Sequence, residues 1–448
     1  ATHGRPGPTW IDIPANIQNA KIDPTALKGF DPEEYTVSLD PELEAKVAHV
    51  VKLLKSASRP LVHVGQGVRI AGAEKEFFKL VETYRLPFVT ARNANDMVPW
   101  DHELYAGRPG TFAQRGANFA VQTSDLYLAV GTRLSLAQTG YNAKDYARNA
   151  KVIMVDIDQA ELDKDTVNLY LKIQTDAKLF LKELNRQLSR AELDNQRWGR
   201  WLAQCQQWKR KYPVVLPEYR EQVGSVNSYH FIDILSDVLT SNDIVVTDMG
   251  FAFQNTHQAF RVKKGQRMFT NCGLASMGWG LPAAVGACFG GGKRRTVCIA
   301  GEGGLLMTIQ EMATIMHHRL PVKLFVLNNG GYLTIKQTQE HGFEGRIMGS
   351  NEESGLSFPD FMKIAEAHRF KGVRLASHRD LKKHIEEVMN HEGPVLCEIM
   401  MDPNQIQGPK AINRRNADGT MKQTALEDSH PFLDPSEVEE NLSIINKM

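Results

Sequence analysis

Along most of the chain, short apolar runs alternate with stretches that have helical spacing. Between residues 40 and 190 the runs are RPLVHVG, SDLYLAVG and AKVIMVDID, and an amphipathic helical stretch, PELEAKVAHVVKLLKSA, precedes them. Continuous apolar runs of this length are typical of strands buried on both faces. Strands that alternate with helices pair in parallel, so the pattern predicts a parallel sheet covered by helices.

A second alternating segment spans residues 223–400. Its runs are DIVVTDMG, RMFTN, TVCIAGEG, VKLFVLNN and PVLCEIMM. We therefore predict an α/β fold with two doubly wound parallel-sheet domains, a central Rossmann-like domain at 40–190 and a second domain at 223–400. Residues 191–222, rich in Gln, Arg and Trp, predict a helical linker whose helix ends at Pro213 and Pro217.

The two ends of the chain lack this alternation. Within residues 1–18, PTWIDIP predicts a lone strand from Thr9 to Pro14. A lone strand has no sheet to pair with, so residues 1–18 are expected to be the remnant of an N-terminal domain. Residues 401–448 predict a polar tail without a core of its own, either disordered or draped on the body.

Composition excludes several classes of function. The 53 Lys and Arg balance 52 Asp and Glu, so no net field attracts nucleic acid or an anionic membrane. The five cysteines form no CxxC pair, which argues against a zinc ribbon or a disulfide framework. No apolar run is long enough to span a bilayer. We expect a cytoplasmic protein that binds a small molecule, without nucleic-acid or membrane partners.

The stretch GEGGLLMTIQEMATIMHHRLPVKLFVLNNGGY, from Gly301 to Tyr332, carries the chemistry. It predicts a strand, a helix over residues 305–316 and a second strand, with Leu305, Ile309, Met312 and Met316 on one helix face. Glu302 and Asn329 then follow two parallel strands, at the sheet edge where ligands bind.

A carboxylate and an amide oxygen at that edge suit Mg²⁺, which takes its remaining ligands from phosphate and water. Gly303 and Gly304 open the helix, so their N–H groups can face a phosphate. Gly331 can expose its carbonyl as a third metal ligand. An acid–Gly turn or an Asn pair alone is more often a structural turn. The combination predicts a Mg²⁺–diphosphate site.

A second glycine-rich turn, GQGVRIAG, begins at Gly65. Its third glycine comes too late for a dinucleotide fingerprint, and no acidic residue stands where a ribose partner should be. The turn therefore favours a plain tight turn over a nucleotide site.

The stretch from Gly301 to Tyr332 resembles the thiamine-diphosphate motif of the decarboxylase and acetolactate synthase superfamily, which begins GDG and ends NN. Other similar segments are CGLASMGWGLPAAVGA, ANFAVQTSDLYLAVGTRL, HGRPGPTWIDIPANIQ and the tail PKAINRRNADGTMKQTALEDSHPFL. The resemblance is to acetolactate synthase-like proteins of the large catalytic subunit type. It implies that most of the N-terminal pyrimidine-binding domain is missing from this chain.

The resemblance implies thiamine diphosphate and Mg²⁺ as cofactors, and it allows FAD in the central domain although no residue set secures it. The metal ligands would be Glu302, Asn329 and Gly331. Met277 would wedge between the two cofactor rings, although a Met without this context is more often a core residue. Ala275 would offer its carbonyl to the aminopyrimidine. The implied cofactor-binding residues are Gly250, Phe251, Ala252, Ala275, Met277, Gly303, Gly304, Asn329, Gly331, Tyr332 and Leu333.

The chain departs from the family pattern at several points. Glu302 replaces Asp, and its extra methylene can move the carboxylate by roughly 1.5 Å. Phe251 and Ala252 replace polar residues. The family's activating Glu belongs to the pyrimidine-binding domain, so no catalytic residue is assigned here. The family builds its sites across a dimer, so a homodimer or homotetramer is expected.

The resemblance implies decarboxylation and carboligation of a 2-oxo acid such as pyruvate. A 2-hydroxyacyl-CoA lyase or an aldehyde carboligase is the alternative among enzymes. A non-catalytic homologue that serves as a partner subunit is the alternative from another class. Glu302 and the missing domain favour this last alternative, whereas the NNGGY and MGWGLPAA segments oppose it.

Overall fold

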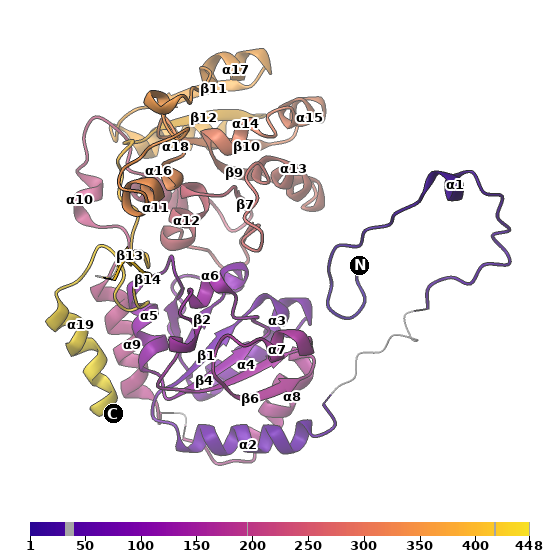
Figure 1. Ribbon diagram of the computed structural model, residues 1–448, viewed down its shortest axis with the longest axis vertical. Coiled ribbons are helices and arrows are strands. Elements are labelled where there is room, and N and C mark those ends of the chain that lie inside the picture. The colour runs from indigo at the N-terminus through magenta and orange to yellow at the C-terminus, as the bar shows by residue number, and fades with distance from the viewer. Residues whose placement is uncertain (32–39, 195, 416–417, 448) are drawn as a thin grey trace.

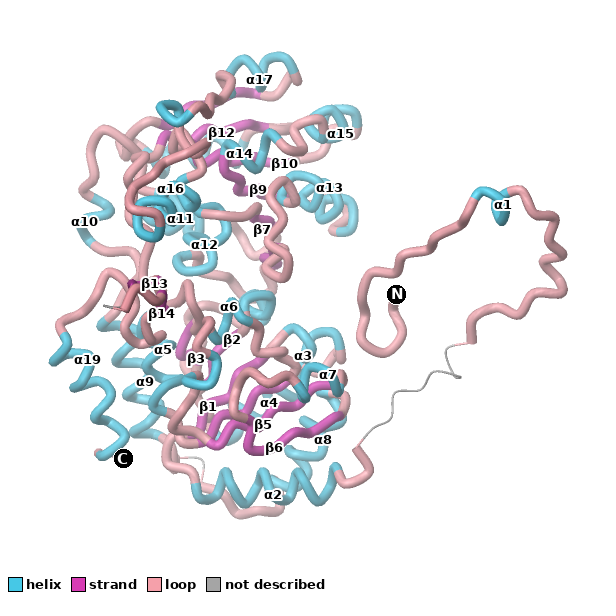
Figure 2. Tube along the Cα trace, viewed as in Figure 1, coloured by secondary structure: helices cyan, strands magenta, loops and turns pink. Residues whose placement is uncertain are grey.

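The computed structural model describes residues 1–31, 40–194, 196–415 and 418–447. Its two large sheets have six strands each and lie in separate parts of the molecule, one above the other in Figure 1. All strand pairs within each large sheet are parallel, and helices flank both sheets (Figure 2). The predicted α/β fold with two parallel sheets is therefore confirmed.

The first sheet has the strand order β3-β2-β1-β4-β5-β6. Successive strands are added on one side of β1 up to β3 and on its other side from β4 onward, so the strand order reverses between β1 and β4. This is the order of dinucleotide-binding folds. Its strands are β1 (Pro60–Val64), β2 (Phe88–Thr90), β3 (Tyr105–Gly107), β4 (Leu126–Val130), β5 (Lys151–Asp156) and β6 (Leu169–Gln174). Around them lie α2 (Leu43–Ser56), α3 (Gln66–Ile70), α4 (Glu74–Tyr84), η2 (Arg92–Met97), α5 (Arg115–Thr123), α6 (Leu136–Thr139), η3 (Ala143–Asp145), α7 (Gln159–Asp163) and α8 (Ala177–Leu188).

The second sheet has the order β11-β12-β10-β9-β7-β8, which reverses between β7 and β9. Its strands are β7 (Ile244–Thr247), β8 (Arg267–Thr270), β9 (Thr296–Gly301), β10 (Val322–Asn328), β11 (Lys371–Leu375) and β12 (Val395–Met400). The accompanying helices are α11 (Ser228–Val238), α12 (Phe251–Ala259), α13 (Gly280–Gly290), α14 (Glu302–Leu306), α15 (Glu311–His317), α16 (Leu333–Gly342), η4 (Glu352–Ser354), α17 (Phe361–Ala367) and α18 (Leu381–Asn390).

The second sheet is buried on both faces. Val297 and Ile299 of β9 belong to one apolar cluster, whereas Cys298 and Ala300 belong to another. Successive side chains of a strand point to opposite faces, so one strand serves both cores. This explains why the strands appear in the sequence as continuous apolar runs rather than alternating ones.

The prediction of one continuous helix over residues 305–316 is wrong, because the structure divides this segment between α14 and α15. Residues 307–310 form a turn, in which the Thr308 hydroxyl donates a hydrogen bond to the Gly278 carbonyl at 2.8 Å. Leu305 and Met312 are still buried in one cluster, and Ile309 and Met316 pack against it. The apolar spacing is therefore correct, although the backbone between the two helices is not helical.

Residues 191–222 do not act as a simple helical linker. Helix α9 (Gly199–Lys211) is part of the first core, where Trp201 and Trp208 are each 1% exposed. The Trp201 indole donates to the Pro60 carbonyl at 2.8 Å. The helix ends ahead of Pro213, but Pro217 begins α10 (Pro217–Arg220) instead of ending a helix. Proline fits the first helical position because that N–H has no partner within the helix.

No strand forms over Thr9 to Pro14, so that prediction is wrong. These residues are exposed and form no β-bridge with another segment that the structure describes, and a strand requires a neighbour for its hydrogen bonds. Residues 1–31 form an arm beside the body in Figure 1, with only α1 (Ala15–Gln18) as a helix. Arg5 pairs with Asp158 at 2.5 Å.

The described part of the tail lies on the body, the second of the two expected alternatives. It contains β13 (Asn413–Arg415), β14 (Met421–Gln423), α19 (Pro435–Leu442) and η5 (Ser443–Asn446). Arg115 of α5 donates to the Ser429 carbonyl at 3.1 Å, and the Trp208 indole donates to Asn441 at 2.7 Å. Ile444 joins the first apolar core. Over the residues described, no helix is long and apolar enough to cross a membrane.

Candidate cofactor site

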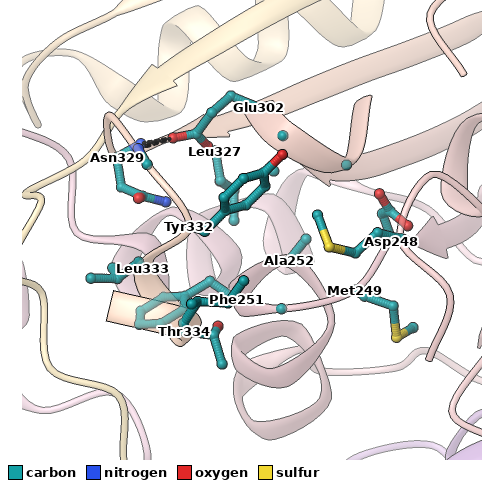
Figure 3. A pocket seen from close by; sticks show the side chains of 17 residues that line it. Asp248, Met249, Phe251, Ala252, Glu302, Leu327, Asn329, Tyr332, Leu333 and Thr334 are labelled. Carbon is teal, nitrogen blue, oxygen red and sulfur yellow. Dashed lines mark hydrogen bonds between the residues drawn. The ribbon is translucent and has the colours of Figure 1, made fainter. Parts of the chain in front are cut away.

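A pocket opens at the carboxyl ends of β7, β9 and β10. Its walls come from residues 248–252 after β7, from 301–304 at the start of α14, from Leu327 near the end of β10, and from Asn329 and residues 331–335 after it, together with Met277. The strand order reverses between β7 and β9, and ligands of such sheets bind at that point. In Figure 3, Glu302 and Asn329 lie at one end of the pocket and Asp248 at the other.

The structure brings most of the predicted site residues together around this pocket. Ala275 is the exception, because it lies in the exposed loop between β8 and α13 and does not line the pocket. Its φ of 56° is left-handed, and its N–H donates to the Asn271 carbonyl at 3.0 Å. The predicted residues that line the pocket are Gly250, Phe251, Ala252, Met277, Glu302, Gly303, Gly304, Asn329, Gly331, Tyr332 and Leu333.

The Glu302 carboxylate closes the turn that follows β10. Its Oε1 accepts hydrogen bonds from the backbone N–H of Asn329 at 3.0 Å and of Gly331 at 2.9 Å (Figure 3). Glu302 is 1% exposed, and this burial raises the pKa of its carboxyl to about 7, while the backbone N–H bonds oppose the rise. A nearby cation would favour the ionised form.

The two adjacent asparagines have different roles. The Asn328 side-chain amide donates to Glu398 at 2.7 Å, and its side-chain oxygen Oδ1 accepts from the Gly330 N–H at 3.0 Å. The Asn329 side chain forms no hydrogen bond with any residue in the described ranges and lines the pocket. Asn328 therefore fixes the turn, and Asn329 is free to bind a ligand.

Close packing requires the glycines of this site. A Cβ on Gly303 would lie 2.0 Å from Cε1 of Tyr332, and a Cβ on Gly304 would lie 2.0 Å from Oδ2 of Asp248. Both glycines belong to the first turn of α14, where the N–H groups have no acceptor within the helix. The absence of side chains thus leaves these N–H groups close to the pocket.

Asp248 is a site residue that the sequence predictions missed. Its carboxylate accepts from the backbone N–H of Gly278 at 3.1 Å and of Gly280 at 3.3 Å, and burial raises its pKa. These bonds fix the turn that follows Met277. The signal was available, because Asp248 comes directly after the apolar run of β7, as Glu302 comes after β9.

The donor set fits a hard cation that keeps water and phosphate ligands. No three His, Cys, Asp or Glu side chains gather as a metal site in the described part of the chain. Glu302, Asn329 and the Gly331 carbonyl offer one carboxylate and two neutral oxygens at the pocket. Magnesium needs few protein ligands when a diphosphate supplies the others.

The corresponding crevice of the first sheet, between β1 and β4, is narrow. The Gly67 N–H donates to the Gly131 carbonyl at 2.9 Å, and a Cβ on Gly65 would lie 2.0 Å from that same oxygen. The GQGVRIAG turn continues into α3 and packs directly on the turn after β4. FAD binding in this domain stays a prediction.

Two family models match separate parts of the chain. The thiamine pyrophosphate enzyme central domain matches residues 47–184, which contain the first sheet. The thiamine pyrophosphate enzyme C-terminal TPP binding domain matches residues 248–399, which contain the pocket.

Several curated proteins are similar to this chain. The acetolactate synthase large subunit of Cyanidium caldarium is 30% identical over 410 residues, which are 89% of this chain and 68% of the relative. Acetolactate synthase isozyme 1 large subunit of Escherichia coli is 30% identical over 408 residues, 90% of this chain and 69% of the relative. Acetolactate synthase 1, chloroplastic, of Zea mays is 30% identical over 414 residues, 90% of this chain and 63% of the relative. The chain thus belongs to the thiamine pyrophosphate enzyme family and is a distant relative of acetolactate synthase large subunits.

Proposed function

We propose that this protein is a thiamine-diphosphate- and Mg²⁺-dependent enzyme that decarboxylates a 2-oxo acid, such as pyruvate, and joins the remaining fragment to a second carbonyl compound. The observation that carries the proposal is the pocket itself, where Glu302, Asn329 and the first turn of α14 meet. The names of the similar acetolactate synthase large subunits support a 2-oxo acid as substrate.

The chain offers separate groups for the metal and for the diphosphate. Glu302, Asn329 and the Gly331 carbonyl would bind Mg²⁺. The N–H groups of Gly303 and Gly304 would face the diphosphate. The opposite wall is formed by Gly250, Phe251 and Ala252, whose apolar side chains leave polar contacts there to backbone groups.

Bound thiamine diphosphate supplies a ring carbon that attacks the 2-oxo acid and an electron sink for the pair left when CO₂ departs. The protein's part is to orient the cofactor and the substrate and to exclude water. Met277 lines the pocket and directly precedes the turn that Asp248 holds. The backbone that carries its thioether is therefore fixed, and the thioether can contact the cofactor rings. A homodimer or homotetramer is part of the proposal, and sedimentation equilibrium would test it.

Calorimetric titration of thiamine diphosphate into the full chain with Mg²⁺ tests the function. We expect metal-dependent binding that Asn329→Ala abolishes, with little change in the free energy of unfolding, because the Asn329 amide bonds to no described residue. The matched control is Asn328→Ala. It should retain metal-dependent binding but lower the free energy of unfolding by about 1–3 kcal/mol, because the buried Glu398 carboxylate loses the hydrogen bond from Asn328. Unchanged affinity in Asn329→Ala would show that the ligand assignment is wrong.

One observation favours a second candidate, a non-catalytic homologue that acts as a partner subunit. Oε1 of Glu302 already accepts two backbone hydrogen bonds, and the carboxyl pKa of about 7 leaves much of it protonated at neutral pH. If the wild-type protein binds no thiamine diphosphate with saturating Mg²⁺ at pH 8, where Glu302 is ionised, this second candidate replaces the first.

A further inference from the structure

A second group of buried polar side chains lies between the two sheets. Arg92 and Asn95 come from η2, Arg108 follows β3, and His257 comes from α12. Arg108 and His257 are 0% exposed, Asn95 is 2% exposed and Arg92 is 9% exposed. Such groups are rarely buried unless hydrogen bonds or opposite charges compensate them.

No acid neutralises the two arginines among the residues that the structure describes. Arg92 donates to the Ala137 carbonyl at 2.8 Å and to the Thr111 hydroxyl at 3.1 Å. Arg108 donates to the backbone carbonyls of His257 at 2.5 Å and Phe260 at 2.8 Å. Uncompensated burial lowers the pKa of Arg92 to about 10.

The acid in the same short helix is already used. The Asp96 carboxylate pairs with Arg69 at 2.5 Å and with Arg267 at 2.8 Å, and it accepts the Met268 N–H at 3.0 Å. The positive charge of Arg92 is therefore not balanced by Asp96.

Several donors of the group have no acceptor in the described parts of the chain. These atoms are Nε of Arg92, Nε of Arg108 and Nε2 of His257. The Asn95 amide lies 3.2 Å from Nδ1 of His257, and when it donates there, Nε2 carries the ring proton and is a donor. Burial and the two guanidinium groups hold the pKa of His257 well below its usual range, so the ring is neutral. Buried polar atoms without partners are uncommon, and the group has three unpaired donors against one unpaired acceptor, Oδ1 of Asn95, so donors are in excess and point to an acceptor from a ligand.

Helix α12 links the group to the cofactor pocket, because it carries both His257 and the pocket residues Phe251 and Ala252. The Arg92 guanidinium lies 5.4 Å from the ring centre of Phe253, and its charge interacts with Cys272. Phe253 follows Phe251 and Ala252 in α12, and Cys272 precedes Met277 in the loop before α13. Phe251, Ala252 and Met277 line the pocket, so Arg92 contacts the residue that follows the pocket wall along α12, although Arg92 itself is not part of that wall.

We propose that Arg92, assisted by His257, binds the carboxylate of a 2-oxo acid at the edge of the cofactor pocket. The inference rests on the proposed function and names a specificity-determining residue for it. A guanidinium without an acid partner suits a planar carboxylate, which accepts two parallel hydrogen bonds. The aromatic rings of Phe112 and Phe253, whose centres lie 5.8 and 5.4 Å from the guanidinium carbon, make its surroundings partly apolar.

The test compares Arg92→Met with Arg115→Met in the full chain. Arg115 is a matched control, because it is also buried and donates only to carbonyl oxygens, those of Ser429 and Pro431. The apparent dissociation constant of pyruvate is measured from the rise in melting temperature with pyruvate concentration, with and without thiamine diphosphate and Mg²⁺. Inorganic phosphate is the second probe.

We expect Arg92→Met to weaken pyruvate binding about 10- to 100-fold and to raise KM with a smaller change in kcat. Arg115→Met should bind pyruvate like the wild type, and the calorimetric affinity for thiamine diphosphate should be unchanged in both variants. If Arg92→Met does not fold, Arg92→Lys replaces it, with an expected loss because lysine lacks the Nε donor and the planar fork.

Equal pyruvate affinity in Arg92→Met and wild type would overturn the proposal, as would wild-type protein that pyruvate does not stabilise. Phosphate that stabilises the wild type as strongly as pyruvate would also overturn it, because the group would then be a general anion site. Failure of the proposed function is seen separately, as absent thiamine diphosphate binding in the wild type.

Discussion

Glu302 has two tasks at one carboxyl group. Its Oε1 holds the turn after β10 through two backbone N–H groups, and the same group is the proposed metal ligand. The longer side chain of Glu, compared with the Asp of the family pattern, reaches from the start of α14 to this turn. Its protonation therefore affects both the turn and the metal.

Magnesium affinity should depend on pH through Glu302. Burial raises the pKa of this carboxyl to about 7, so a proton competes with the metal below that pH. We expect the affinity for Mg²⁺ in the presence of thiamine diphosphate to fall by up to about tenfold per pH unit below pH 7 and to level off above it. Calorimetric titrations of Mg²⁺ between about pH 5.5 and about pH 8.5 measure this pH dependence.

Stability provides the control for the same group. A raised pKa in the folded state means that Glu302 stabilises the fold when it is protonated. Its contribution is full below the usual pKa of 4.5 and is lost as pH rises through about 7. Glu302→Gln should remove this part of the pH dependence of urea unfolding in the metal-free protein. An unaltered pH profile in the variant would contradict the assignment of the raised pKa to Glu302.

Single residues also mark where sequence reasoning stops. The motif predicted Glu302 and Asn329 together, and both line one pocket. The motif also picked Asn329 rather than Asn328 as the ligand, but the physical reason lay outside the motif, because it comes from Glu398 on the neighbouring strand β12, which accepts the Asn328 amide. The position of Asp248 after an apolar run was a usable signal, but its role was not, since its partners belong to a turn 30 residues later along the chain.

At the scale of elements, the start of α14 is fixed by contact with Asp248. A Cβ at residue 304 would lie 2.0 Å from Oδ2 of Asp248, so Gly304→Ala must displace the carboxylate or the helix. We expect the variant to lose about 1–3 kcal/mol of unfolding free energy, measured by urea denaturation. Addition of Asp248→Ala should recover part of that loss, because the clashing oxygen is then absent.

Gly301→Ala is the control for this helix start. Nothing lies within 4 Å of a Cβ placed there, and the φ of Gly301 is −80°, which any residue can adopt. The change in unfolding free energy should be below about 1 kcal/mol. Equal losses for Gly301→Ala and Gly304→Ala would show that helix propensity, and not the contact with Asp248, decides the outcome.

Most strands that the sequence predicted lie inside the sheets, and β8, predicted from RMFTN, is the exception at a sheet edge. Strands β1, β4, β9 and β10 are buried and appear as apolar runs, whereas β11 at a sheet edge is mostly exposed and was missed. Short β2 and β3 have three residues each, too few for a periodic signal. Helix α9 was taken for a linker because it is polar overall. The spacing of its tryptophans, with Trp198, Trp201 and Trp208 on one face, was the signal for burial.

At the scale of the whole molecule, Asp96 connects the two sheets. It comes from η2 beside the first sheet and pairs with Arg267 of β8 in the second, as well as with Arg69. Asp96→Asn should lower the free energy of unfolding by about 2–4 kcal/mol, because a buried carboxylate between two cations is lost. Calorimetric scans should then show two transitions that are farther apart than in the wild type, since the contact between the sheets is weakened.

Glu103→Gln is the control for this ion pair. Glu103 pairs with Arg85 at 3.1 Å, but its side chain is 67% exposed, so solvent screens the pair. The expected change is below about 1 kcal/mol. A similar loss in both variants would mean that the burial of Asp96 adds nothing to its pairing.

The return of the tail to the first sheet has a consequence for how the chain folds during synthesis. Asn441 bonds to Trp208 across 233 positions, and Arg115 bonds to Ser429 across 314. Leu426 and Ile444 complete a core whose other members precede residue 209. Contacts so distant in sequence form slowly. The domain translated earlier must therefore wait, with part of its surface uncovered, until the ribosome has produced the residues that seal it.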